Sequence, residues 1–238
     1  DTVVDVLCKG DATGAINISI AGGNPAYTYT WDDGNPNEDR TGLIAGNYSV
    51  TVEDQNGCQD SRSFTVNEPL LDLTIQLDSS RSLDCFGDGD GFIAISVTGG
   101  TPGYSYDWDN SANTQDLFNI SGGTYEVTVT DTNNCIAIQS FTINEPTALG
   151  INVDATSDAG CIGTNDGSAT ISGTGGTPNY TFNWSNGGNG TTQSNLGAGT
   201  YLITITDDNG CTAIDSVTIN QPSDFQITLV NQTNVSCN

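Results

Sequence analysis

Residues 123–146 read GTYEVTVTDTNNCIAIQSFTINEP, two runs rich in apolar residues on either side of a polar turn. Before the turn, Tyr125, Val127 and Val129 alternate with polar residues, and the run IAIQSFTI after the turn is again rich in apolar and β-branched residues. Alternation with a period of two is typical of a strand that buries one face. The Asp and Asn residues of the turn accept the positive backbone angles that tight hairpins need. The stretch therefore predicts a β-hairpin.

The same hairpin recurs twice, as GNYSVTVEDQNGCQDSRSFTVNEP at 46–69 and as GTYLITITDDNGCTAIDSVTINQP at 199–222. Other residues keep the same period of 76 or 77 positions, namely Trp31, Trp108 and Trp184, and the cysteines Cys8, Cys58, Cys85, Cys135, Cys161, Cys211 and Cys237. A fixed period of this length predicts tandem repeat domains. We expect three repeats, at 1–69, 70–146 and 147–222, with 223–238 as the first strand of a fourth, and hence a segment of a longer protein.

Within the second repeat, alternating runs at 73–77 and 92–97 precede GGTPGYSYDW at 99–108. Six or seven short antiparallel strands separated by turn residues predict a β-sandwich. Because residues two apart share a face, we assign one set of aromatic residues to the core: Trp31, Trp108, Trp184, Tyr48, Tyr125 and Tyr201. On the strand that ends at each tryptophan, as in Tyr104, Tyr106 and Trp108, most rings are assigned to the core, and the tryptophan, nearest the strand end, is expected to be the one that is partly exposed. With two residues joining one repeat to the next, we expect an elongated rod.

The charge balance excludes several partners. The chain has 29 acidic and 4 basic residues, for a net charge of -25. Phosphate backbones and anionic lipids would be repelled, so nucleic-acid binding and membrane insertion are not expected. An acidic, solvated surface suits an extracellular protein.

Catalysis finds little support in the sequence. The chain has no histidine, which excludes His-based triads and His metal ligands. The cysteines are not in C-x-x-C spacing, so zinc and thioredoxin-like sites are not expected. The pairs Asp88 with Asp90 and Asp107 with Asp109 resemble glycosidase carboxylates, but their counterparts in the other repeats include Thr, Asn and Ser. We therefore predict no enzymatic activity and no cofactor.

Three aspartates do recur, at Asp54, Asp131 and Asp207, each at the first position of the hairpin turn. An Asp side chain at this position accepts backbone N–H bonds, which is a structural role. Calcium binding is the functional alternative, since hard oxygen ligands suit this ion. No D-x-D-x-D-G loop recurs, so the structural role is preferred.

The order of these features resembles the SprB repeat, related to the immunoglobulin-like and PKD-like modules of Bacteroidota surface proteins. The features are the first cysteine, a Gly- and Asp-rich turn, GG-T-P-x-Y-x-Y-x-W, Gly-T-Y-x-V-x-V, D-x-N-G-C and an x-E-P junction. The resemblance implies an adhesin at the cell surface, associated with the outer membrane and exported by type IX secretion. In gliding bacteria it implies transport by the motility machinery. Implied partners are neighbouring repeats and, through other parts of the parent protein, surface polysaccharide or the secretion machinery.

Cysteines in small extracellular domains predict disulfides. A bond could form within a repeat, or from the first cysteine of one repeat to the second cysteine of the next, as from Cys8 to Cys135. One strand in 109–123 would place four strands between Cys85 and Cys135 and both cysteines at one end of the domain, whereas two strands would place them at opposite ends. That stretch has a single apolar cluster, at 117–120. We therefore predict the bonds Cys8–Cys58, Cys85–Cys135 and Cys161–Cys211, with Cys237 unpaired.

Two functions fit the sequence. A stalk needs stiffness and length, and the short junctions between repeats favour it. A ligand-binding module, for carbohydrate or dependent on calcium, would use the loops after each tryptophan, which vary most between repeats. We prefer the stalk for this segment.

Overall fold

The computed structural model describes residues 1–232. In that range the chain is all-β, and each predicted repeat holds six strands. The first repeat contains β1 (Thr2–Val4), β2 (Gly14–Asn17), β3 (Thr28–Trp31), β4 (Arg40–Leu43), β5 (Gly46–Glu53) and β6 (Gln59–Val66). The second contains β7 (Thr74–Arg81), β8 (Gly91–Thr98), β9 (Ser105–Trp108), β10 (Leu117–Ile120), β11 (Gly123–Thr130) and β12 (Ile136–Ile143). The third contains β13 (Gly150–Ser157), β14 (Gly167–Thr174), β15 (Thr181–Trp184), β16 (Thr192–Leu196), β17 (Gly199–Thr206) and β18 (Thr212–Ile219).

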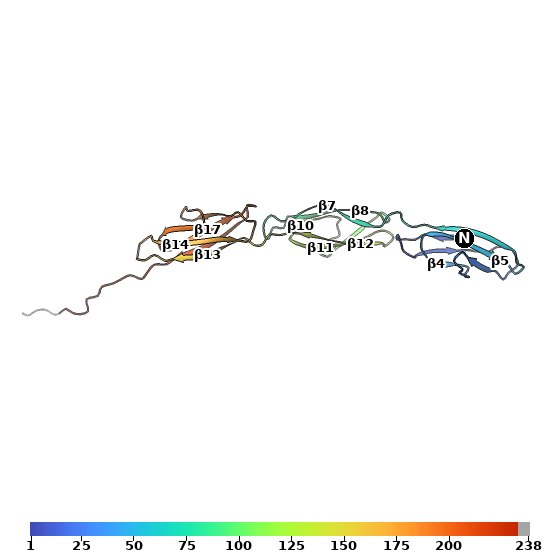
Figure 1. Ribbon diagram of the computed structural model, residues 1–238, viewed down its shortest axis with the longest axis horizontal. Coiled ribbons are helices and arrows are strands. Elements are labelled where there is room, and N and C mark those ends of the chain that lie inside the picture. The colour runs from blue at the N-terminus through green and yellow to red at the C-terminus, as the bar shows by residue number, and fades with distance from the viewer. Residues whose placement is uncertain (233–238) are drawn as a thin grey trace, which may run out of the picture. The chain divides into compact units, whose positions relative to one another are not determined.

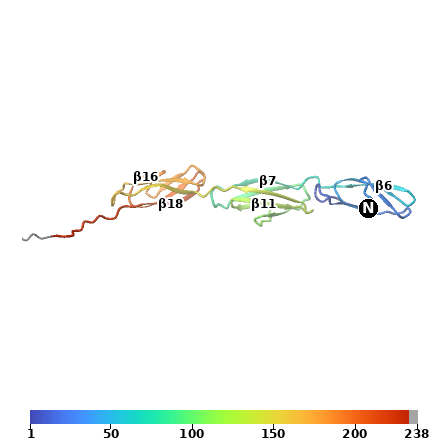
Figure 2. The same cartoon turned by 60° about the horizontal axis from the view of Figure 1, so that its bottom comes forward.

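Each repeat is a sandwich of two three-stranded antiparallel sheets. In the second repeat one sheet has the order β7-β8-β10 and the other β9-β11-β12. Strand β7 lies on one side of this repeat and β11 on the other in both views (Figures 1 and 2). The first and third repeats have the equivalent orders. The all-β prediction of tandem immunoglobulin-like sandwiches is confirmed.

The core of each sandwich lies between its sheets, and the strand alternation builds it. In β8, Gly91, Ile93 and Ile95 are buried, while the residues between them are less so. In the third repeat Ile171 from one sheet and Ile203, Ile205 from the other join one buried cluster. Burial of these aliphatic side chains supplies the main favourable free energy of folding.

The six aromatic residues assigned to the core differ in burial: the three tryptophans are buried and the three tyrosines are half-buried. Trp31, Trp108 and Trp184 keep only 1%, 2% and 4% of their surface exposed, so the expectation that they are partly exposed is wrong. The reason is that the chain turns sharply after each one, and its indole N–H donates to a carbonyl six residues on, as from Trp108 Nε1 to Thr114 O at 2.9 Å. The half-buried tyrosines Tyr48, Tyr125 and Tyr201 pin the preceding corner through their hydroxyls, which donate to the carbonyl four residues earlier.

The chain divides into two compact units. The first consists of residues 1–82 and 90–143, and the second of residues 83–89 and the chain from Asn144 onward. The predicted rod concerns the placement of these units and stays a prediction. No helix long and apolar enough to cross a membrane occurs in residues 1–232.

Residues 223–232 form no strand, and their assignment to the first strand of a fourth repeat stays a prediction. A strand needs a neighbour, and in the second and third repeats this neighbour is the next strand along the chain. Cys237, predicted to be unpaired, lies outside the described residues.

Candidate functional site: the disulfide junction

The loop that carries Cys8 is held against the last residues of the first repeat. Val6 N donates to Asn67 O at 2.8 Å, and Gly10 N donates to Glu68 Oε2 at 2.7 Å. Asn67 and Glu68 directly follow β6, where the chain leaves the first repeat. Cys8 therefore sits beside the peptide connection to the second repeat.

The hairpin that carries Cys135 is organised by one carboxylate. Asp131 Oδ1 accepts from the backbone N–H groups of Asn133 at 2.8 Å and Cys135 at 2.9 Å, and its Oδ2 accepts from Thr101 N at 2.8 Å. Burial raises the pKa of Asp131, but the three N–H donors together outweigh it and hold the pKa below its ordinary value. The carboxylate thus fixes the turn and ties it to the loop that precedes β9.

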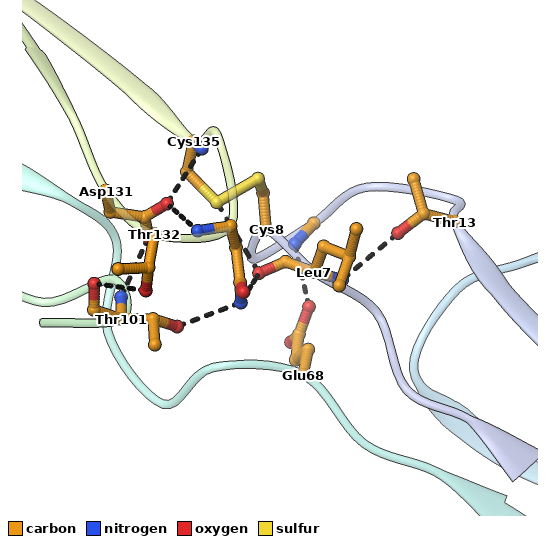
Figure 3. The surroundings of a disulfide bond; sticks show 10 residues. Leu7, Cys8, Thr13, Glu68, Thr101, Asp131, Thr132 and Cys135 are labelled. Atoms are coloured by element: carbon orange, nitrogen blue, oxygen red, sulfur yellow. Dashed lines mark hydrogen bonds between the residues drawn. A yellow bond between two sulfur atoms is a disulfide. The ribbon is translucent and has the colours of Figure 1, made fainter. Parts of the chain in front are cut away.

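These two elements meet in a disulfide between Cys8 and Cys135 (Figure 3). The sulfurs are 2.03 Å apart and the Cα atoms 5.5 Å apart, within the range that a disulfide requires. Asn133 supports the contact, since its Nδ2 donates to Leu7 O at 3.2 Å and to Thr101 Oγ1 at 2.9 Å. One side chain thereby bridges the loop of the first repeat and the hairpin of the second.

The same arrangement recurs in the second unit. Cys85 bonds to Cys211 with a Cα separation of 5.6 Å, and Asn209 Nδ2 donates to Asp84 O at 3.0 Å. Asp207 accepts the equivalent three backbone bonds, that from Thr177 lowering its pKa most. The bridging role of the asparagine in this turn was not predicted from the sequence. Its signal was the recurrence of Asn56, Asn133 and Asn209 at one position.

The predicted bonds Cys8–Cys58, Cys85–Cys135 and Cys161–Cys211 are therefore wrong. The open alternative, from the first cysteine of one repeat to the second cysteine of the next, is what forms. Cys58 and Cys161 are free and exposed.

Strand direction explains this error. In the first repeat β4 ends opposite the start of β2, since Leu43 pairs with Gly14, and β5 begins three residues later at Gly46. Strands β2 and β5 therefore start at the same end and run the same way. Both β3 and β4 run against them, one in each sheet, so these two four-residue strands traverse the domain only once.

The chain therefore crosses the domain three times between Cys8 and Cys58, along β2, then β3 and β4, then β5, and not four times. The stretch after the tryptophan does hold a single strand, as predicted, but the two cysteines still lie at opposite ends. Eight residues of β5 span about 26 Å, far beyond the roughly 7 Å that a disulfide allows between Cα atoms.

The acidic residues do not form a metal cluster in the described part of the chain: no group of three or more Asp, Glu or Cys side chains there is placed to hold an ion. Asp54 accepts backbone N–H bonds from Asn24, Cys58 and Asn56, which lower its pKa. Of the carboxylates considered for catalysis, Asp90 pairs with Arg81 at 2.9 Å.

Comparison with known families is informative for each repeat. The model of the SprB repeat matches residues 1–36, 78–113 and 153–189, so each match contains one first cysteine and one tryptophan. The SprB-repeat model thus matches the chain three times, once in each predicted repeat. No curated protein matches the chain.

Solved structures that match the chain include a bacteriophage protein and a Drosophila protein. The three N-terminal domains of the highly immunogenic outer capsid protein (Hoc) of bacteriophage RB49 are 15% identical, with 92% of this chain and 96% of that one covered and a TM-score of 0.38. The N-terminal eight Ig domains of Down Syndrome Cell Adhesion Molecule are 12% identical over 82% of this chain and 33% of that one, with a TM-score of 0.41. Extracellular domains 3-5 of Drosophila OTK are 13% identical, with 84% of this chain and 87% of that one covered and a TM-score of 0.29. The fold assignment of the SprB repeats rests on their sheet topology.

Proposed function

We propose that this chain is a non-enzymatic stalk segment of a large secreted adhesin on the surface of a Bacteroidota bacterium. The observation that carries the proposal is the bond between Cys8 and Cys135, which gives the first two repeats a second covalent connection beside the peptide link after Glu68. A pair of connections at one junction restrains bending there more than a single flexible linker would.

The disulfides also limit extension under tension. In the oxidised chain the shortest covalent path runs from Asp1 to Cys8, across to Cys135, back to Cys85, across to Cys211 and onward. It leaves most residues out of the path, so the fully extended length is about a third of that of the reduced chain. A stalk between a moving cell and a surface needs this resistance to unravelling.

The cellular setting follows from the family and the cysteines. Disulfides persist in oxidising, extracellular surroundings, and a net charge of -25 keeps a crowded surface protein soluble. We include export by type IX secretion, outer-membrane association and a role in gliding in the proposal, on the basis of the SprB repeats.

A carbohydrate-binding module receives less support. Exposed aromatic rings can stack on sugars, but Trp31, Trp108 and Trp184 are buried in the cores. The rings therefore pack the sandwiches and offer no exposed indole platform for a sugar. Calcium binding remains a lesser alternative.

Pulling the chain from its two ends by single-molecule force spectroscopy tests the stalk proposal. The oxidised protein should reach about a third of the extension of the dithiothreitol-reduced protein before its tension rises without further unfolding. Cys58→Ser is the matched control, because this free cysteine lies outside both bonds. Equal extension of the oxidised and reduced proteins would contradict the proposal.

A further inference from the structure

The hairpin turn that carries Cys211 depends on the side-chain amide of Asn209. Its Nδ2 donates to Asp84 O at 3.0 Å and to Thr177 Oγ1 at 3.0 Å. Asp84 directly precedes Cys85, so the first of these bonds lies beside the Cys85–Cys211 disulfide. An ionised carboxylate accepts hydrogen bonds but cannot donate one to a carbonyl. This junction therefore requires an amide at position 209.

The residue that follows Asn209 is Gly210, and this order makes the amide chemically labile. The backbone nitrogen after an asparagine can attack the side-chain Cγ, which closes a five-membered succinimide ring and releases ammonia. Water then opens the ring and leaves aspartate or isoaspartate. Glycine permits the attack most readily, because it has no Cβ to hinder the approach of its nitrogen. Asn209 thus combines a required amide with the neighbour that most favours its loss.

The other disulfide junction differs at this one residue. The equivalent Asn133 donates to Leu7 O and Thr101 Oγ1 in the same way, but it is followed by Asn134. Asn134 and Gly210 both adopt a left-handed backbone, with φ of 65° and 85°. The two turns therefore have similar backbones, while only Asn134 has a Cβ that hinders the attack. Rapid deamidation is expected only at Gly210, in the junction of the second unit.

The closed junction holds both reacting groups in hydrogen bonds. Gly210 N, the nucleophile, donates to Asp207 O at 3.1 Å. The amide that it would attack is bonded to Asp84 O, and the disulfide next to Asp84 keeps that carbonyl in place. A backbone hydrogen bond in an exposed turn opens readily by local fluctuation. The amide can turn towards Gly210 N only when it has left Asp84 O, so an intact junction slows the reaction.

Deamidation would change this turn in two ways. A carboxylate at position 209 would lie beside Asp84 O, to which it cannot donate, and near the buried carboxylate of Asp207, whose Oδ1 accepts from the backbone N–H of residue 209. Isoaspartate also lengthens the backbone of the turn by one methylene. This displaces the N–H of Cys211, which donates to the same oxygen of Asp207 at 2.9 Å. Both products therefore disfavour the closed junction.

We propose that Asn209 is a deamidation site that the closed junction protects, and that its deamidation makes opening of this junction irreversible. A thiol reductant opens the Cys85–Cys211 bond by exchange, and the released amide then reacts with Gly210 N. The product cannot restore the bond to Asp84 O. The inference concerns the chemistry of one turn and does not depend on the stalk proposal.

Each step balances. Two reductant thiols become one disulfide, while Cys85 and Cys211 gain two electrons and two protons. The bond from Gly210 N to Cγ of Asn209 then forms as the bond from Cγ to Nδ2 breaks, and the nitrogen leaves as ammonia with the proton of Gly210 N. One water molecule finally opens the succinimide and leaves a carboxylate and a proton.

The experiment compares the full oxidised chain with the variant Cys85→Ser, Cys211→Ser, both incubated in warm, mildly alkaline buffer. Peptide mass spectrometry follows deamidation at Asn209 and at Asn189, which also precedes a glycine and is exposed in the loop after Trp184. Loss of the disulfide should speed deamidation of Asn209 about tenfold, as expected when local opening controls the rate, and leave Asn189 unchanged. Unchanged fluorescence of the buried tryptophans shows that the variant stays folded.

A second measurement keeps both cysteines and tests the consequence. Asn209→Asp reproduces one product of deamidation, and Asn189→Asp adds the same charge in an exposed loop of the same repeat. Dithiothreitol should reduce the Cys85–Cys211 bond several-fold faster in the Asn209→Asp chain than in the Asn189→Asp chain. Thiol labelling followed by peptide mapping gives the two rates.

Two results would overturn the proposal. One is equal deamidation of Asn209 with and without the disulfide, which would show that the junction gives no protection. The other is equal reduction of the Asn209→Asp and Asn189→Asp chains, which would show that the lost amide does not loosen the junction. Neither result bears on the extension of the oxidised chain under force, so the stalk proposal is tested separately.

Discussion

Cys8 and Cys135 are bonded although 127 residues separate them in sequence. The bond closes around Asn133, whose side chain holds the carbonyl of Leu7 beside the sulfurs. Each repeat therefore presents its first cysteine at the end where the chain leaves it and its second cysteine at the end where the chain enters. This placement of the two cysteines brings the first cysteine of one repeat beside the second cysteine of the next, where they form the disulfide.

Removing the disulfide between Cys8 and Cys135 should destabilise the folded repeats. On the chain-entropy estimate, closing a loop of this length stabilises the folded protein by about 5 kcal/mol, and removing a native disulfide from a small secreted domain typically costs about 2 to 5 kcal/mol. The double variant Cys8→Ser, Cys135→Ser should lower the midpoint of denaturant unfolding accordingly, as followed by tryptophan fluorescence. Cys58→Ser, which removes a free thiol, should leave the midpoint unchanged. An equal effect of both changes would contradict a structural role for the bond.

Replacing Asp207 in the hairpin turn should lower thermal stability more than replacing its neighbour Asp208. Asp207→Ala removes the acceptor of three backbone N–H bonds, while Asp208→Ala changes an exposed side chain in the same turn. We expect Asp207→Ala to lower the Tm by several degrees, since unpaired buried donors are costly. Calorimetry with Asp208→Ala as the control checks this. Equal Tm values for the two variants would show that the carboxylate does not fix the turn.

The same carboxylates give a pH dependence. The pKa values of Asp54, Asp131 and Asp207 are lowered in the folded chain. Their stabilisation is therefore complete above the unfolded pKa of about 3.9 and is lost as the pH falls through the lower folded values. Unfolding free energy from these groups should stay level from pH 7 to 5 and decline below about pH 4. A decline centred near pH 6 would point to other groups.

Two equivalent glycines should differ in their tolerance of alanine. Gly99 and Gly22 both have positive φ, at 78° and 87°, so alanine brings similar backbone strain at each. Only at Gly99 would the added Cβ collide with a backbone carbonyl, that of Asp72. Gly99→Ala should therefore destabilise its repeat clearly more than Gly22→Ala in urea unfolding. Comparable losses would mean that the first repeat is covered at this point as the second is.

Much of this architecture could be predicted from the sequence, because period-two alternation and Asp-Asn turns act locally. The hairpin of β11 and β12, the strand at 117–120 and the structural role of Asp131 all follow from short-range patterns. The disulfide pairing could not be obtained in this way. It depends on the direction of two short strands in different sheets, and alternation identifies a strand without fixing its direction.

The prediction that the tryptophans are partly exposed was wrong for a related reason. Trp108 ends its strand, a position that is often exposed, but the chain then folds back so that Thr114 O accepts from the indole. Burial here depends on the loop, whose sequence varies between repeats.

The most direct test of the account is the disulfide map of the secreted protein. Proteolysis without reduction, with free thiols blocked beforehand, should yield linked peptides containing Cys8 with Cys135 and Cys85 with Cys211. Recovery of Cys8 linked to Cys58, or of Cys85 linked to Cys135, would contradict the stapled junction and the stalk mechanism built on it.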